Sequence, residues 1–179
     1  MKEIKVSNTR FELYITNEEI KKRITELATQ MNLDLVQKNP LFLGILNGSF
    51  IFAAELFQHL NIECEISFLK LASYEGTSSS GNVKRLIGIN EDIKNRTVII
   101  LEDIIDTGIT INHIVKQLTD YEPQEILIAT LLMKPEVFNN KYKIDYCCFE
   151  IPNEFIVGYG LDCNGHGRNL KDIYKIVND

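Results

Sequence analysis

Short continuous apolar runs alternate with stretches of helical spacing along this chain. One run spans residues 41–46, and a second, rich in β-branched residues, spans residues 97–101. Continuous apolar runs of this length predict buried strands, which β-branched residues favour. Each run is followed by a break of small or polar residues and then by an apolar helical pattern. Strands that alternate with helices predict an α/β fold with a mainly parallel sheet.

A long helix is predicted over residues 17–32. Thr16 is followed three residues later by Glu19, which is the pattern of a capping box at a helix N-terminus. Apolar positions then recur at the spacing of one helix face. They are Ile20, Ile24, Leu27, Ala28 and Met31.

The same patterns predict the remaining helices and strands. The helices span residues 50–60 and a stretch after residue 110. The strands span residues 62–71, 83–89, 125–133, 145–149, 155–158 and 173–177. We expect the strand over 83–89 to pair with the strand over 62–71 as a hairpin. Residues 72–82 between them are rich in Ser and Gly, and such a run is predicted to form a mobile loop.

The second apolar run ends in two carboxylates, Glu102 and Asp103, and a turn of small residues leads into the next helix. This order predicts a site at the carboxyl end of a parallel sheet. A helix N-terminus preceded by Gly108, with the hydroxyls of Thr107 and Thr110, suits a phosphate. The two carboxylates can accept hydrogen bonds from a sugar diol or hold magnesium. The sequence therefore indicates a ribose 5-phosphate site, and the alternative is an acidic, solvated turn.

A second glycine-containing loop, residues 44–49, follows the first strand and lies at the same end of the predicted sheet. Gly48 permits close backbone approach, so amides here can bind pyrophosphate. The loop has neither the Gly-Lys-[Ser/Thr] ending of a Walker A loop nor the Gly-x-Ser-x-Gly of a nucleophile elbow. An ordinary turn is the alternative interpretation.

Length and charge exclude several classes of protein. The chain has 179 residues and is most simply a single domain over residues 1–179. Its net charge of −6 argues against a dedicated surface for nucleic acid or anionic membranes. No apolar run approaches the length of a transmembrane helix, and the N-terminus lacks the apolar core of a signal peptide.

The cysteines and histidines do not form a recognisable framework. Cys64, Cys147, Cys148 and Cys163 include no C-x-x-C pair, so neither a disulfide scaffold nor a zinc site is indicated. The three histidines are scattered without metal-ligand spacing. Reduced thiols in a cytoplasmic protein are the expectation.

Glu-Asp-Ile-Ile-Asp-Thr-Gly at residues 102–108 resembles the phosphoribosyl pyrophosphate signature of the type I phosphoribosyltransferases. Further motifs extend the resemblance to the hypoxanthine–guanine phosphoribosyltransferase family, from about residue 15 to the C-terminus. They are Leu-x-Gly-Ser at 46–49, Ser73-Tyr74 in the Ser-rich loop, and segments 131–134, 149–152, 155–159 and 161–162, with Arg168 following. The resemblance implies the type I phosphoribosyltransferase fold, an α/β fold whose mainly parallel central sheet is flanked by helices, with a small hood formed by the terminal segments.

The resemblance also implies an activity. Members transfer the 5-phosphoribosyl group from phosphoribosyl pyrophosphate to hypoxanthine or guanine, with Mg²⁺, and release pyrophosphate. A cytoplasmic purine salvage enzyme that forms a homodimer or homotetramer is therefore expected, with no nucleic-acid or membrane partner. Three alternatives stay open: a phosphoribosyltransferase for another base such as xanthine, a non-catalytic regulator with this fold, and a structural protein with a vestigial site.

Residue roles follow from the family motifs. Lys134 would hydrogen-bond the oxygen at C6 of the purine, Phe155 would stack on the base, and Asp106 would exchange the proton at N7. Asp162 would help hold the second magnesium and Arg168 would grip pyrophosphate. Without the resemblance, Lys134 would be a solvated surface lysine and Phe155 a core residue.

The resemblance also implies which residues bind each substrate and the metal. The phosphoribosyl pyrophosphate set is Leu46, Asn47, Gly48, Ser49, Glu102, Asp103, Asp106, Thr107, Gly108, Ile109, Thr110 and Arg168. The purine set is Lys134, Phe155, Ile156 and Asp162, the metal set is Glu102, Asp103 and Asp162, and Ser73 and Tyr74 belong to the lid loop.

The chain departs from the family pattern at three places. Asn47 stands where many members have Lys or Arg, which removes a charge near the pyrophosphate site. Ile109 stands where a Lys or polar residue is common. Residues 165–167, Gly-His-Gly, precede Arg168 where an aromatic residue commonly stands.

Overall fold

The computed structural model describes the chain except residues 1–2, 75–82, 88–89, 140–141 and 178–179. Its central sheet has the order β5-β4-β3-β6-β7-β8. The strands from β4 to β8 in this order are parallel, whereas β5 joins the edge as an antiparallel strand. Their bounds are β3 Leu41–Leu46, β4 Glu65–Tyr74, β5 Val83–Ile87, β6 Thr97–Ile105, β7 Glu125–Met133 and β8 Tyr146–Glu150.

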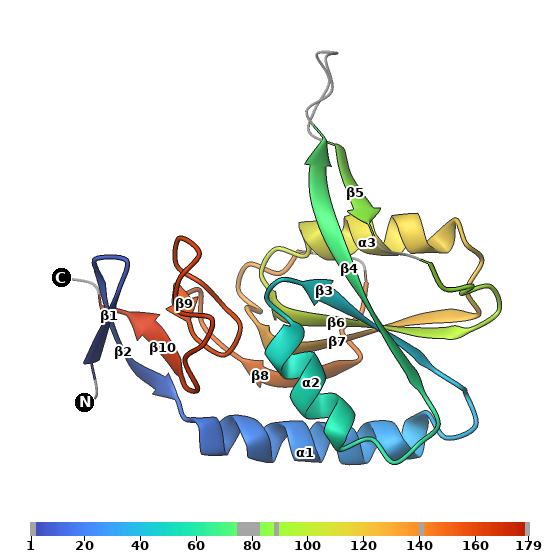
Figure 1. The fold of residues 1–179 in the computed structure, drawn as a ribbon, viewed down its shortest axis with the longest axis horizontal. Helices are drawn as coiled ribbons and strands as arrows, with labels where there is room; N and C mark the ends of the chain where they lie inside the picture. The colour runs from blue at the N-terminus through green and yellow to red at the C-terminus, as the bar shows by residue number, and fades with distance from the viewer. Residues whose placement is uncertain (1–2, 75–82, 88–89, 140–141, 178–179) are drawn as a thin grey trace.

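Helices cover both faces of this sheet (Figure 1). Residues of α1 (Asn17–Asp34) and α2 (Phe50–Gln58) share one buried cluster with Phe42 of β3. Residues of α3 (Ile109–Thr119) share the opposite cluster with Leu41 and Leu43. Successive strand residues point to opposite faces, so a continuous apolar run such as β3 fills two cores at once.

A second, antiparallel sheet is built from both ends of the chain and is called the terminal sheet below. It has the order β1-β2-β10-β9 and lies at one end of the molecule beside both termini (Figure 1). Its strands are β1 Glu3–Val6, β2 Thr9–Ile15, β9 Ile156–Val157 and β10 Ile173–Ile176. The predicted fold class, a mainly parallel sheet flanked by helices with a hood of terminal segments, is confirmed.

Several predicted boundaries are corrected by the structure. The strand predicted over 62–71 is β4, which begins at Glu65 and continues through Tyr74. Residues 72–74, including Ser73 and Tyr74, are therefore strand rather than loop, because they pair with residues 83–85 of β5. The rest of the predicted loop, 75–82, lies outside the described residues. The predicted hairpin pairing is confirmed, although it joins Lys70–Tyr74 to Val83–Ile87.

Other elements shift by a few residues or were not predicted. The second helix ends at Gln58 rather than residue 60. The strand predicted over 145–149 spans 146–150, and the one over 155–158 shortens to 156–157. Neither β1 nor β2 was predicted, although apolar residues alternate along β2 at Phe11, Leu13 and Ile15. In the part of the chain that the structure describes, no helix is long and apolar enough to cross a membrane.

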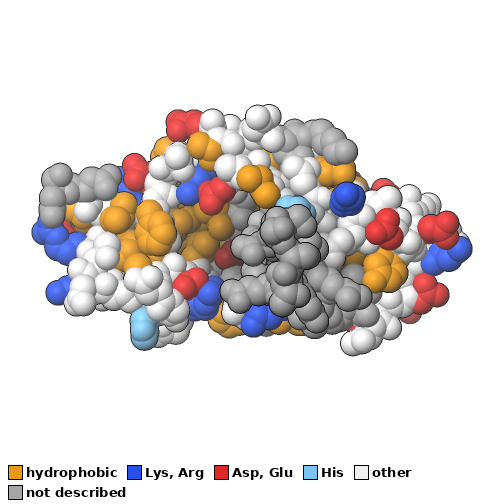
Figure 2. Space-filling model, turned by 90° about the horizontal axis from the view of Figure 1, so that it is seen from above, with side chains coloured by type: hydrophobic (Ala, Val, Ile, Leu, Met, Phe, Trp, Pro, Cys, Tyr) orange, Lys and Arg blue, Asp and Glu red, His pale blue; other side chains and the backbone are white. Residues whose placement is uncertain are grey.

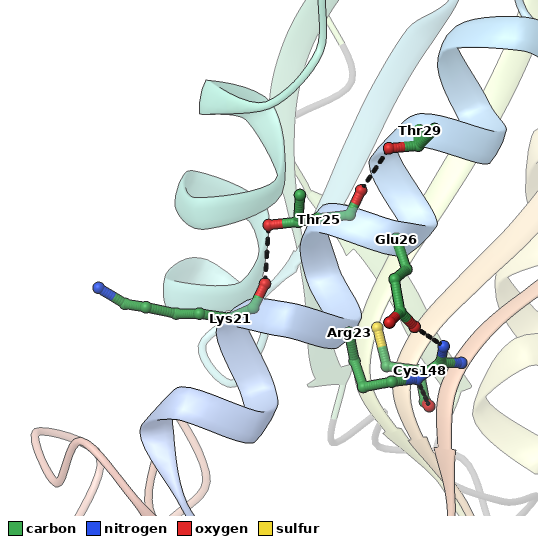
Figure 3. A network of polar contacts seen from close by, with 6 residues as sticks. All are labelled: Lys21, Arg23, Thr25, Glu26, Thr29 and Cys148. Carbon is green, nitrogen blue, oxygen red and sulfur yellow. Dashed lines mark hydrogen bonds and ion pairs between the residues drawn. The ribbon is translucent and has the colours of Figure 1, made fainter.

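Helix α1 is fixed at its start and along its length. The predicted capping box is confirmed: Glu19 N donates to Thr16 Oγ1 (3.3 Å), and Thr16 N donates to Glu19 Oε2 (2.9 Å). Arg23, paired with Glu26, donates from Nε to the carbonyl oxygen of Cys148 at 3.0 Å (Figure 3). Because β8 is the last strand of the sheet, this contact occupies a carbonyl that no further strand covers.

Candidate active site

The carboxyl ends of three adjacent parallel strands meet at one edge of the central sheet. β3 pairs with β6, and β6 pairs with β7, each in parallel. The loop after β3 carries Gly48, the turn after β6 carries Asp106, and Lys134 directly follows β7. The sheet therefore brings together segments that the sequence places almost ninety residues apart.

The two acidic residues of β6 face different surroundings. The prediction that Glu102 and Asp103 end the strand is wrong, because pairing with β7 continues as far as Ile105. Neighbouring strand residues point to opposite sides. Glu102 lines a pocket of about 150 Å³ together with residues 104–111. Asp103 instead packs against Gly48, where a Cβ atom would lie 1.6 Å from Asp103 Oδ2.

Burial dominates the electrostatics of both carboxyls. Burial, and then the neighbouring Asp103, raise the pKa of Glu102 well above its usual range. Burial also raises the pKa of Asp103 to about 6; the charge of Arg168 lowers it and that of Asp162 raises it. Asp103 thus interacts with two residues of the chain's last third, and a cation nearby would stabilise both ionised acids.

The pocket beside Glu102 has the features of an anion site. Gly108 has φ +82° and immediately precedes α3, so the first amides of the helix lie at the pocket. The amide of Ile109 donates to Thr107 Oγ1 at 3.4 Å. Ile109 itself is 59% exposed. Residues 107–110, which the sequence predicts to bind a phosphate, therefore line one pocket together with Glu102.

The loop after β3 is held by hydrogen bonds to the end of that strand. The peptide bond between Leu46 and Asn47 is cis. Asn47 is exposed, whereas Ser49 is fully buried. Ser49 Oγ donates to the carbonyl oxygen of Ile45 at 2.7 Å. The backbone N of Ser49 also donates to this carbonyl oxygen, at 3.3 Å, so both the hydroxyl and the amide of Ser49 are bound to β3.

Lys134 is not the solvated surface residue that its sequence context alone suggested. Its backbone N donates to the carbonyl oxygen of Ile105 (3.0 Å), and its side chain is buried. Lys134 Nζ lies 2.8 Å from Asp106 Oδ1, and the Asp106 side chain is 52% exposed. A buried ammonium and a solvent-accessible carboxylate therefore lie side by side at the pocket beside Glu102.

The segment after β9, residues 158–170, closes on the loop after β3. Arg168 Nη2 lies 2.5 Å from Asp162 Oδ1, and Arg168 Nη1 donates to the carbonyl oxygen of Gly160 at 2.7 Å. Gly160 has φ +101°, and a Cβ there would lie 2.1 Å from the carbonyl oxygen of Gly48. This segment, the loop after β3 and Asp103 thus pack directly on one another, with the two predicted residues Asp162 and Arg168 paired.

The predicted base-stacking residue belongs to the terminal sheet's end of the molecule. Phe155 is 49% exposed and immediately precedes β9, where Ile156 is buried. Figure 2 shows hydrophobic side chains gathered over this end. Sequence reasoning missed Phe11, whose ring lies against Phe155; the alternation of Phe11, Leu13 and Ile15 was the available signal. Ser73 and Tyr74 lie in β4, so the predicted lid residues are strand residues.

Comparison with known proteins decides the family. The phosphoribosyl transferase domain family matches residues 13–164. The chain belongs to this phosphoribosyltransferase family. The resemblance read from the sequence is therefore confirmed.

Relatives of this phosphoribosyltransferase include enzymes of known structure. A hypoxanthine-guanine phosphoribosyltransferase from Streptococcus pyogenes serotype M3 (strain ATCC BAA-595 / MGAS315) is 46% identical over 159 residues, 88% of each chain. A crystal structure of a hypoxanthine-guanine phosphoribosyltransferase from Bacillus anthracis is 34% identical, with a TM-score of 0.85 over 93% of this chain and 98% of that one. A hypoxanthine phosphoribosyltransferase from Staphylococcus aureus gives the same identity and TM-score, over 93% and 91%.

Proposed function

We propose that this phosphoribosyltransferase transfers the 5-phosphoribosyl group from phosphoribosyl pyrophosphate to hypoxanthine or guanine, forming IMP or GMP and releasing pyrophosphate. The observation that carries the proposal is the Lys134–Asp106 pair beside the phosphate pocket. An ammonium is only a donor, so Lys134 favours a purine with an oxygen at C6 over adenine. The names of the relatives, which are hypoxanthine-guanine or hypoxanthine enzymes, support the same substrate class.

Asp106 is the proposed proton acceptor. Its side chain is half exposed, lines the pocket together with residues 107–110, and lies 2.8 Å from Lys134 Nζ. As the new C–N bond forms, the base must lose a proton from its imidazole ring, and a positioned carboxylate removes it. Lys134 holds the base by its oxygen at C6, which directs N7 toward Asp106.

The ribose 5-phosphate and pyrophosphate ends are assigned to separate groups. The pocket at the α3 N-terminus, from Thr107 to Thr110, is proposed to hold the 5-phosphate, and Glu102 the ribose diol. The loop at residues 46–49 and Arg168 are proposed to hold pyrophosphate. Arg168 suits this through its charge and forked donors.

Magnesium fits the donor set. Among the described residues no group of three or more His, Cys, Asp or Glu side chains is arranged to hold a metal ion. Mg²⁺, however, commonly binds through one or two carboxylates plus substrate phosphates. Glu102, Asp103 and Asp162 are the residues proposed to hold it, and the burial that raises the pKa of the first two favours a cation. Bound magnesium would neutralise charge on the departing pyrophosphate.

Ser73 and Tyr74 are proposed to cover the reacting centre. They end β4, which pairs in parallel with β3, so they lie toward the same edge of the sheet as the other groups. Excluding water matters because the ribose carries positive charge as its C–O bond breaks.

The wider assignments are also proposals. We assign the enzyme to purine salvage in the cytoplasm, as a homodimer or homotetramer with no nucleic-acid or membrane partner. Xanthine in place of hypoxanthine or guanine is the main alternative substrate, because it too has an oxygen at C6. A non-catalytic regulator is the alternative outside enzymes, and a buried Lys134 beside Asp106 argues against it.

One assay tests the proposal. Purified protein is incubated with phosphoribosyl pyrophosphate, Mg²⁺ and, separately, hypoxanthine, guanine, xanthine or adenine, and nucleotide is measured by chromatography. IMP or GMP should form, and chelating magnesium should abolish this. Turnover of adenine alone would contradict the assignment to oxo-purines, and no turnover of any base would favour a regulator.

A further inference from the structure

The ring of Phe155 rests on a residue that lies far from it in the sequence. The centroid of the Phe11 ring, on β2, lies 6.1 Å from that of Phe155, with an angle of 39° between the ring planes. Phe11 is fully buried, whereas Phe155 is 49% exposed. One ring of the pair is therefore available to a ligand, and the other supports it from inside the protein.

The main chain of Phe155 is held by the same part of the terminal sheet. The backbone N of Ile176, on β10, donates to the carbonyl oxygen of Phe155 at 2.9 Å. Ile176 is in turn the residue opposite Phe11 in the antiparallel pairing of β10 with β2. A single cross-strand pair thus contacts Phe155 twice, through a ring contact and through a main-chain hydrogen bond.

The side chain of Phe11 packs only in apolar surroundings among the described residues of its cluster. It lies in a small buried cluster with Val6, Val157, Cys163 and Tyr174, which joins both ends of the chain. Phe11 also precedes residues 13–164, the part that matches the phosphoribosyl transferase domain. The support of the candidate stacking residue therefore comes from a part of β2 that precedes the family match.

We propose that Phe11 is a positioning residue for the purine: it holds the ring of Phe155 in the orientation in which a flat aromatic base stacks on it. The inference rests on the proposed function, which makes Phe155 the stacking residue. Stacked bases contact the face of an aromatic side chain, so a ring that tilts freely loses much of this contact. Phosphoribosyl pyrophosphate is held at the ends of β3 and β6, so its binding should not depend on Phe11.

The effect of losing the ring is measured on the two substrates separately. An aromatic pair at this separation corresponds to about a two- to tenfold change in an equilibrium constant. Phe11→Leu removes the ring and keeps an apolar side chain, and Phe11→Ala removes both. We expect the KM for hypoxanthine to rise about two- to tenfold in Phe11→Leu, and further in Phe11→Ala, while the KM for phosphoribosyl pyrophosphate and kcat change less than about twofold. If Phe11→Ala does not fold, Phe11→Leu alone tests the inference.

Val6→Ala is the matched control, because Val6 is buried in the same cluster on β1. It should lower the melting temperature without raising the KM for hypoxanthine. If Val6→Ala and Phe11→Leu raise that KM equally at similar losses of stability, Phe11 has only a structural role and the inference is overturned.

A double-mutant cycle separates action through Phe155 from any other effect. In a Phe155→Ala background, Phe11→Leu should leave the KM for hypoxanthine unchanged. The same fold-rise in that background, or an unchanged KM in Phe11→Leu alone, would overturn the inference while leaving the proposed function intact. A wild-type protein that forms no nucleotide would overturn the proposed function, and the inference with it.

Discussion

Lys134 Nζ lies 2.8 Å from Asp106 Oδ1 at the carboxyl end of the central sheet. The two residues follow neighbouring strands, and Lys134 is tied to the end of β6 by its hydrogen bond to Ile105. We propose that an oxo-purine exchanges this ion pair for two contacts of its own, from its C6 oxygen to Lys134 and from N7 to Asp106. The ion pair thus orients both side chains before the base arrives.

Replacing Lys134 tests the base-reading half of this pair. Lys134→Ala should raise the KM for hypoxanthine more than the KM for phosphoribosyl pyrophosphate, because a charged hydrogen bond of about 1.5–3 kcal/mol is lost. Lys143→Ala is the control, since Lys143 also pairs with an aspartate but its side chain is 83% exposed. Steady-state kinetics give both constants. Equal losses for the two substrates would contradict a role in reading the base.

A substitution at Gly48 tests how the loop after β3 packs on β6. Gly48→Ala places a Cβ 1.6 Å from Asp103 Oδ2, so we expect a loss of about 1–3 kcal/mol in stability from overpacking and weaker binding of phosphoribosyl pyrophosphate. Thermal unfolding and calorimetric titration measure the two effects.

The cause can be checked in an Asp103→Ala background, where the colliding carboxylate is absent. Gly48→Ala should then cost much less stability than it does in the wild type. A loss of the same size in both backgrounds would show that the carboxylate is not the cause.

Because of two cysteines, Cys147 and Cys148, we expect the free energy of unfolding to fall at alkaline pH. Burial, first of all, raises the pKa of Cys147 to about 11 and that of Cys148 to about 12. A raised pKa in the folded state means that the folded protein keeps its protons while the unfolded chain loses them. The contribution of these two thiols to the free energy of unfolding is therefore fully present below the unfolded pKa of about 8.5. It is lost as the pH rises toward 11–12.

Denaturant unfolding from pH 7 to 10.5 measures this dependence. The free energy of unfolding should fall with pH, and the fall should be smaller in Cys148→Ala. In the folded protein at pH 8, an alkylating reagent should label Cys147 and Cys148 far more slowly than in urea, because the thiolate reacts. Labelling at equal rates in both conditions would refute the burial of these thiols.

The local sequence predicted the elements whose signals are local. Thr16 and Glu19 fixed the start of α1, and continuous apolar runs fixed β3 and β7, whose bounds the structure reproduces. Elements stabilised by distant partners were harder to predict. β2 pairs with β10, about 160 residues away, and β4 extends through Tyr74 only because β5 pairs with it.

In the candidate site, too, local features could be predicted from the sequence and features that depend on distant partners could not. The acidic motif predicted where the pocket beside Glu102 lies, because strand, turn and helix start follow one another in the chain. The opposite surroundings of Glu102 and Asp103 follow from β6 continuing to Ile105, which depends on its neighbour β7. The contact between Phe11 and Phe155 depends on how the two ends of the chain meet, and no short motif encodes it.

A substitution at Ile109 tests whether a positive charge at the proposed phosphate pocket strengthens substrate binding. Ile109 is 59% exposed and lines the pocket at the start of α3. Ile109→Lys should lower the KM for phosphoribosyl pyrophosphate and make it more sensitive to salt. It should also cost about 0.3–1 kcal/mol in stability, since a cation at a helix N-terminus is unfavourable. Ile109→Met is the uncharged control, and an equal change in both variants would exclude charge as the cause.

The central claim is that phosphoribosyl transfer to an oxo-purine takes place at this edge of the sheet with Asp106 as the proton acceptor. Asp106→Asn keeps the shape of the side chain but removes its basicity, whereas Glu102→Gln should mainly weaken binding of the ribose and magnesium. A rapid-quench measurement of a single turnover avoids masking by slow product release. We predict that nucleotide formation slows by about 10²–10⁴-fold in Asp106→Asn, with nucleotide binding retained. A single-turnover rate equal to that of the wild type across pH would contradict this assignment.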